Sequence, residues 1–221
     1  MGFWIIKILA TTLGEVGGDA VTMSMDLGYL VGTALFAVVF AFAVSLQIRA
    51  TAFGPWRYWF AIIASTTVGT TLADFVDRSL GIGYSGGSAL LLSLLLGSLW
   101  LWHRDTGSIA VESITSHRSQ YHYWATITFS QTLGTALGDW AADTQGLGYT
   151  GGMLLFGGLL AVVAALHFTR RLPDTLLFWA AFVLTRPLGA VVGDFLDKPL
   201  DHGGLALSRY TGTAVLLVVI G

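Results

Sequence analysis

Four aspartates recur at equivalent positions in a chain that is otherwise mostly apolar. Each one ends a short motif in which a small residue follows a glycine by four positions and the aspartate comes next. The motifs occupy residues 12–19, 67–74, 132–139 and 187–194. Carboxylates inside a membrane-spanning segment are costly, and by default they mark a path for ions or protons. The candidate metal ligands are therefore the motif aspartates Asp19, Asp74, Asp139 and Asp194.

Glu15 adds a fifth carboxylate, one helical turn before Asp19 and on the same predicted helix face. Two carboxylates one turn apart can share a cation or a proton, so Glu15 joins the candidate metal ligands. The alternative is a hydrogen bond between Glu15 and a threonine of a neighbouring helix, with no ion involved. The equivalent positions of the other motifs hold Thr70, Thr135 and Ala190.

Arg186 lies three positions before the fourth motif glycine, where the other repeats have Thr11, Thr66 and Gln131. An arginine buried in an apolar protein needs an anionic partner. We expect it within salt-bridge reach of Glu15 or of a motif aspartate. It is then either a counter-charge that holds the site when no cation is bound, or half of a fixed structural ion pair.

Two of the aspartates have a base four residues later, which suits an i,i+4 ion pair. These pairs are Asp74 with Arg78 and Asp194 with Lys198, whereas Asp19 and Asp139 have no such local base. On this basis Asp19 should carry the least compensated charge, and Asp19→Asn should impair transport most. Lys7 is nearer the start of its helix, where a lysine can extend its ammonium group to the membrane surface.

The glycines of the motifs form small-xxx-small pairs, which let helix backbones approach closely in lipid. Simple helix packing explains these glycines without any chemistry. Close packing of four such helices would also bring the adjacent aspartates toward one axis.

Composition places the chain among membrane proteins. Of its 221 residues 54% are hydrophobic and only 11% are charged, against about 25% charged in soluble domains. A net charge of −2 argues against a nucleic-acid partner. With no cysteine there is neither a disulfide nor a thiolate metal site.

Spans of about 20 apolar residues predict an all-α polytopic membrane protein with eight transmembrane helices. The predicted helices cover residues 2–25, 29–48, 56–77, 85–102, 121–142, 150–168, 175–196 and 206–221. They form four two-helix repeats, each read as a helical hairpin whose first helix carries the motif. The motif glycines are 55, 65 and 55 residues apart, so two halves are offset by 120 residues.

The repeats are parallel, because each contains an even number of spans, and the two halves should be pseudo-symmetric. We divide the chain into a first half (residues 1–102), a linker (103–120) and a second half (121–221). Arginines follow the second, fourth and sixth helices, so the positive-inside rule places the linker and both termini in the cytoplasm. The acidic or balanced loops on the other side contain Asp26, Asp77, Asp143 and Asp197.

The outer turns repeat as well, because residues 81–87 and 146–152 share a Gly-x-Gly-Tyr-x-Gly-Gly pattern. Glycine supplies the positive φ that such turns need, and the tyrosines suit an interfacial aromatic belt. With its motifs and turns, nearly the whole chain resembles a bacterial family built from four copies of a short membrane repeat of unknown function. Ala73, Pro187 and the eroded fourth turn depart from the pattern, so the four repeats are not equivalent.

The resemblance implies a fold but no activity, so the function must come from the residues. Carboxylates, hydroxyls and carbonyls without cysteine favour hard ions such as Mn²⁺ or Mg²⁺. The first hypothesis is an inner-membrane cation transporter for metal export or homeostasis, not an enzyme and with no cofactor beyond the transported ion. Its expected partners are the lipid bilayer and a metal cation. The sequence leaves open whether the chain forms a homo-oligomer.

Two alternatives belong to other classes. In one, the chain is a structural or regulatory membrane protein whose acids only form internal salt bridges with Arg186, Arg78 and Lys198. In the other it is an intramembrane aspartyl protease, but the Gly-x-Gly-Asp motif of those enzymes is complete in none of the repeats.

Overall fold

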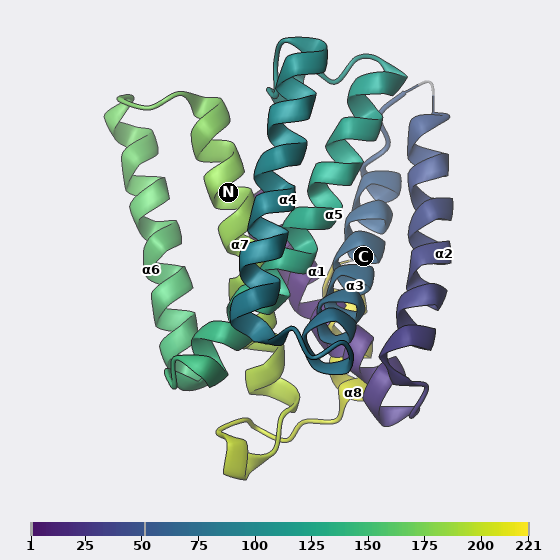
Figure 1. The fold of residues 1–221 in the computed structure, drawn as a ribbon, viewed down its shortest axis with the longest axis vertical. Coiled ribbons are helices and arrows are strands. Elements are labelled where there is room, and N and C mark those ends of the chain that lie inside the picture. Colours follow the sequence, from purple (N-terminus) through teal and green to yellow (C-terminus); the bar gives the residue numbers. More distant parts are fainter. Residues whose placement is uncertain (1, 51, 221) are drawn as a thin grey trace.

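The computed structural model describes residues 2–50 and 52–220, and the regular structure of this part is entirely helical (Figure 1). Its α-helices are α1 (Gly2–Asp19), α2 (Gly28–Ile48), α3 (Pro55–Asp74), α4 (Gly83–Thr106), α5 (His117–Asp139), α6 (Gly148–Thr169), α7 (Asp174–Asp197) and α8 (Arg209–Ile220). The prediction of an all-helical chain is confirmed. The last helix begins at Arg209, later than expected, because residues 203–208 form a turn and a segment without regular secondary structure after α7.

Three of the motif helices continue into a π-helical turn directly after the aspartate. These turns are η1 (Ala20–Ser24), η2 (Phe75–Ser79) and η4 (Trp140–Thr144). Their wider winding is visible in i→i+5 backbone hydrogen bonds, for example from the Met25 amide to the Ala20 carbonyl at 2.9 Å. The fourth motif helix, α7, stays α-helical as far as Asp197. Since π-helical turns are frequent at functional sites, the helix ends that carry the aspartates are candidates for such a site.

The four motif helices pack as a closed ring. Helix α1 contacts α3 and α7, and α5 contacts the same two helices from the opposite side. The end of this ring that carries the motif aspartates, at the bottom of Figure 1, is called the motif end here, and the opposite end is the linker end. Short 3-10 turns occur in the linker (η3, Val111–Ser113) and before α8 (η5, Leu200–His202).

The remaining helices lie outside this ring, each against the motif helix of the following repeat. Helix α2 packs along α3, α4 along α5, α6 along α7, and α8 returns to α1. The hairpin interpretation of each repeat is therefore corrected: the tight turn connects the two helices, but the packing partner comes from the next repeat. This exchange of partners ties all four repeats into one unit.

Glycines of the motifs fix the register of the ring. A Cβ on Gly14 would lie 2.3 Å from the Thr66 side chain, and one on Gly134 would lie 2.1 Å from Arg186. The same relation continues around the ring, from Gly69 to Gln131 and from Gly189 to Thr11. In each case the residue three positions before one motif glycine fills the space over the glycine of the preceding helix, so equivalent positions make equivalent contacts.

Five of the described helices are long and apolar enough to cross a membrane: α2, α3 with η2, α4, α6 and α7. Helices α1 and α5 carry polar residues along the face that they bury in the ring, which lowers their hydropathy. Buried members of α5 include Thr126, Ser130, Gln131 and Thr135. Only twelve residues form α8.

A cluster of aromatic side chains closes the ring at the linker end. Trp102 is completely buried, and its ring meets those of Tyr123 and Trp179 edge to face. The hydroxyls of Tyr58 and Tyr123 are 3.0 Å apart. The interior is thus sealed by apolar packing at one end and by charged groups at the other.

Candidate functional site

All four motif aspartates are buried within the protein, at the motif end of the ring. Their exposed fractions lie between 1% for Asp19 and 4% for Asp139. The prediction that these carboxylates turn toward the bundle interior is confirmed. The small residues that precede them bring the helices close enough to enclose them.

Arg78 bridges two of the aspartates. Its Nε is 3.1 Å from Asp74 Oδ1, and its Nη2 is 3.4 Å from Asp139 Oδ2. The same guanidinium donates hydrogen bonds to the hydroxyls of Tyr29 and Tyr84, each at 3.0 Å. We call these five residues the Arg78 pole. The turn tyrosines, expected to act only as interfacial anchors, hold this base in place.

Lys198 bridges the other two aspartates. Its Nζ is 2.5 Å from Asp19 Oδ2 and 3.1 Å from Asp194 Oδ1. Arg209, at the start of α8, forms an ion pair with Asp197 and is 3.9 Å from Asp19. These residues, Asp19, Asp194, Asp197, Lys198 and Arg209, are called the Lys198 pole.

The two bridges correct the expectation that Asp19 is uncompensated. Sequence reasoning found the partners four residues away, Asp74 with Arg78 and Asp194 with Lys198, and the structure contains both. Each base also reaches the aspartate of the following repeat around the ring, Asp139 or Asp19. That second contact depends on helix packing, which local spacing does not reveal.

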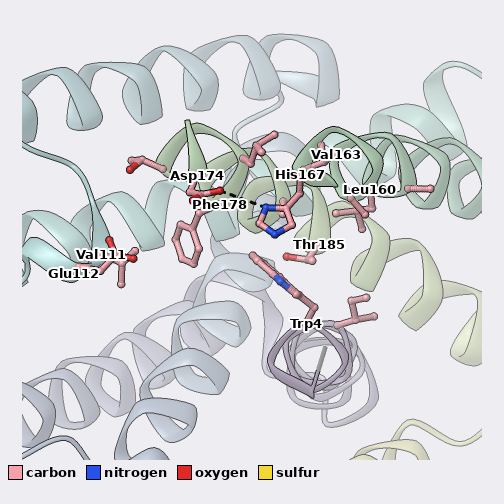
Figure 2. A pocket seen from close by; sticks show the side chains of 15 residues that line it. Trp4, Val111, Glu112, Leu160, Val163, His167, Asp174, Phe178 and Thr185 are labelled. Atoms are coloured by element: carbon pink, nitrogen blue, oxygen red, sulfur yellow. Dashed lines mark ion pairs between the residues drawn. The ribbon is translucent and has the colours of Figure 1, made fainter. Parts of the chain in front are cut away.

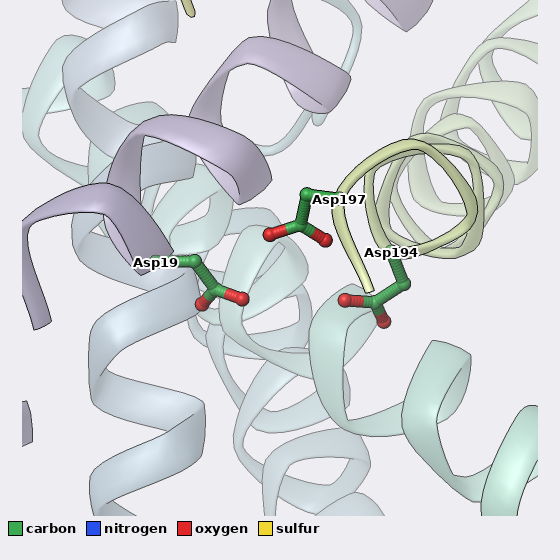
Figure 3. Close-up of side chains that lie close together, drawn as sticks. All are labelled: Asp19, Asp194 and Asp197. Carbon is green, nitrogen blue, oxygen red and sulfur yellow. The ribbon is translucent and has the colours of Figure 1, made fainter. Parts of the chain in front are cut away.

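Three carboxylates of the Lys198 pole could hold a metal ion. One ligand oxygen from each of Asp19, Asp194 and Asp197 lies within 4.8 Å of the others (Figure 3). In the described part of the chain, Asp19 Oδ1 and Asp197 Oδ1 are buried without a hydrogen-bond partner. The site therefore combines clustered oxygen ligands with unused acceptor capacity.

Asp197 is absent from the sequence-predicted ligands because it was assigned to a polar loop, as was Asp77. Both are buried instead, with exposed fractions of 8% and 5%. A signal for them exists in the sequence: the second and fourth repeats share an Asp-x-x-Asp pattern followed by a base, Arg78 or Lys198. Residues three apart on a helix share a face, so the second aspartate could have been placed beside the first.

Glu15 lies one turn deeper than this layer, with Arg186. Arg186 Nη2 is 2.8 Å from Glu15 Oε2 and also donates to the hydroxyls of Thr70 and Thr135, at 2.6 and 2.5 Å. The predicted salt bridge between these two residues is confirmed. Since the four residues come from α7, α1, α3 and α5, the arginine occupies the ring axis. The sequence-predicted ligands thus divide among the two poles and this axial pair.

Lys7 does not reach the surface as expected. It is completely buried, its Nζ lies 3.9 Å from the centroid of the Phe182 ring, and it donates to Thr185 Oγ1 at 3.4 Å. The side chain turns into the ring because α1 is enclosed by α3, α7 and α8. A second basic side chain therefore lies on the linker side of the axial pair.

Neither the curated proteins nor the solved structures contain a match to this chain. A family model described as Repeat of Unknown Function (DUF347) matches residues 2–53, 57–108, 122–172 and 177–221. These segments cover each motif together with its turn and following helix. The chain therefore belongs to this family of repeat proteins of unknown function, and four copies of the repeat make up most of its length.

Proposed function

We propose that the protein is a cation transporter of the bacterial inner membrane that carries a divalent metal ion such as Mn²⁺ or Mg²⁺. In this proposal all eight helices span the bilayer as four parallel repeats with pseudo-symmetric halves. The polar faces of α1 and α5 do not prevent insertion, since the ring encloses them. The linker end faces the cytoplasm, in accord with the arginines of its loops.

The observation that carries this proposal is the charge balance of the two poles. Together they contain five buried carboxylates, Asp19, Asp74, Asp139, Asp194 and Asp197, and three bases, Arg78, Lys198 and Arg209. Buried charges without compensation cost several kcal/mol each. A surplus of carboxylates supports the binding of a further cation or of protons.

The Lys198 pole suits exchange better than the Arg78 pole. Arg78 is fixed here by two tyrosines, whereas Lys198 is a compact point charge on a flexible side chain. Lys198 follows the last residue of α7 and has an extended backbone conformation. In the proposed mechanism its ammonium group lies between Asp19 and Asp194 until the metal ion displaces it.

Arg186 gives the path a central barrier. Its guanidinium lies on the ring axis between the poles and the buried Lys7, so a cation would meet the positive charge of Arg186 before it reached the linker end. In the proposed mechanism Arg186 stays paired with Glu15, and the surrounding helices move to let the metal ion pass. Carboxylate and hydroxyl oxygens along this path favour hard cations.

A second candidate is a structural membrane protein whose acids serve only in ion pairs. The ion pairs of Arg78, Lys198 and Arg186 favour this alternative, because each of these three bases has a carboxylate partner. The two unused oxygens and the carboxylate surplus at the Lys198 pole favour transport.

Metal flux into proteoliposomes tests the choice. We expect Mn²⁺ uptake by the unmodified protein and its loss in Asp19→Asn, Asp194→Asn and Asp197→Asn, measured with an internal metal-sensitive dye. Asp201→Asn is the matched control, since this carboxylate is exposed at the same end of the molecule. Folded protein is matched between samples by size-exclusion chromatography.

Flux that persists in all three pole variants would refute the proposed ion site. Absence of flux in the unmodified protein, together with loss of folded protein in the variants, would instead support the structural candidate.

A further inference from the structure

A cavity lies away from both poles, on the outside of the ring near the linker end (Figure 2). It has a volume of about 670 Å³ and is lined by residues of α1, α6, α7 and the linker. Small-molecule pockets typically measure about 300–1,000 Å³. Apolar residues of this lateral pocket include Trp4, Ile8, Leu160, Ala164 and Phe178.

The ionisable residues that line the lateral pocket are two acids, Glu112 and Asp174, and one histidine, His167. Glu112 and Asp174 line it and are exposed, whereas no lysine or arginine of the described chain is among its lining residues. His167 Nδ1 is 3.4 Å from one oxygen of Asp174, as the dashed line in Figure 2 shows.

Aromatic rings complete the chemistry of the pocket. The ring centroids of Trp4 and Phe178 are 5.8 Å apart at an interplanar angle of 49°. The face of an aromatic ring attracts a cation, most strongly where water is excluded. Thr185 forms part of the wall, and the buried Lys7 lies behind it rather than in the pocket.

We propose that the lateral pocket binds a hydrophobic organic cation. Its apolar body lies between α1, α6 and α7, and its charge lies near the aromatic pair and the carboxylates of Glu112 and Asp174. An anionic or neutral ligand gains the apolar contacts but not the charge complementarity. This site is separate from the metal path and does not depend on the proposed transport.

Two ions of nearly the same shape and opposite charge test the proposal, tetraphenylphosphonium and tetraphenylborate. Binding of each to the purified full chain in a neutral detergent is measured by equilibrium dialysis. We expect the cation to bind at least about tenfold more tightly than the anion. The double variant Glu112→Gln/Asp174→Asn should weaken cation binding about tenfold. Ala164→Trp should remove it by filling the pocket.

The control is Asp143→Asn/Asp201→Asn, which removes two exposed carboxylates from the motif end. It should bind the cation like the unmodified protein, whether or not the unmodified protein transports metal. Equal binding of the two ions, binding unchanged by the loss of Glu112 and Asp174, or no binding at all would each overturn the proposal. Equal binding would show a groove that only accepts lipid chains.

Discussion

At the candidate ion site, one base forms ion pairs with two carboxylates in each pole. Arg78 and Lys198 occupy equivalent positions in the second and fourth repeats, but their surroundings differ. Arg78 is held between two tyrosine hydroxyls, whereas Lys198 has Met23 as its further neighbour, with Nζ 4.0 Å from the sulfur. The two equivalent bases therefore have different neighbours.

Replacing Lys198 with methionine tests whether its ammonium group and the metal ion compete for the same carboxylates. The loss of its ammonium leaves Asp19 and Asp194 without their shared base, so the free energy of unfolding in the presence of a chelator should fall by about 3 kcal/mol. Added Mn²⁺ should then raise the melting temperature more than it does for the unmodified protein. Lys198→Arg keeps the charge and is the control. If Mn²⁺ stabilises the methionine variant no more than the unmodified protein, Lys198 does not occupy a metal position.

Arg186 and Glu15 allow a double-mutant cycle. Arg186→Met leaves a buried carboxylate alone and should reduce the free energy of unfolding by about 3–5 kcal/mol. Adding Glu15→Met should restore most of this loss, because the apolar pair no longer carries an isolated charge. Thermal unfolding in detergent provides the measurement. Additive losses from the two substitutions would show that the 2.8 Å contact carries no coupling.

At the scale of helices, the small residues set how closely the motif helices approach. Gly134 lies against Arg186, and Gly193 lies against Glu15, where an added Cβ would be 2.7 Å from the glutamate side chain. The glycines thus position the same charged pair that occupies the axis. The π-helical turns after the first three motifs then widen the helix ends that carry Asp19, Asp74 and Asp139.

Gly134→Ala should therefore disturb the site from a distance. The new methyl group would overlap Arg186 Cγ, and overpacking of this kind costs about 1–3 kcal/mol. Gly157→Ala in α6 is the matched control, because a Cβ there meets no atom of the described chain within 4 Å. That substitution should be neutral or stabilising by up to about 1 kcal/mol. Melting temperatures of the two variants check the expectation, and equal values would contradict the packing argument.

At the scale of the whole molecule, the cyclic order of the helices joins the two ends of the chain. Helix α8 packs on α1, so the last repeat contributes to the ring as the first three do. Arg209, from the start of α8, also reaches Asp19 of α1 and Asp197 of α7. The Lys198 pole therefore exists only when the ring is closed.

Orientation can be tested directly because the natural chain has no cysteine. His117→Cys places a thiol at the linker end and Gln145→Cys places one at the motif end, both at exposed positions. In intact spheroplasts a membrane-impermeant maleimide should label the Gln145 variant alone, and the His117 variant should react only after permeabilisation. The opposite pattern would reverse the proposed topology.

The sequence by itself determined the helical class, the four repeats and the register of the motifs. Glycine spacing and apolar length are local properties, so they can be read along the chain. They also indicated the i,i+4 partners of Asp74 and Asp194, and the need of Arg186 for an anionic partner.

Only the tertiary structure decided which residues from different repeats meet. The second partners of Arg78 and Lys198, the burial of Asp197 and the enclosure of Lys7 depend on how α1, α3, α5 and α7 close into a ring. The packing of each outer helix on the next repeat likewise has no local signature. Contacts between distant segments arise from the fit of whole helix faces, and that fit is a property of the assembled molecule.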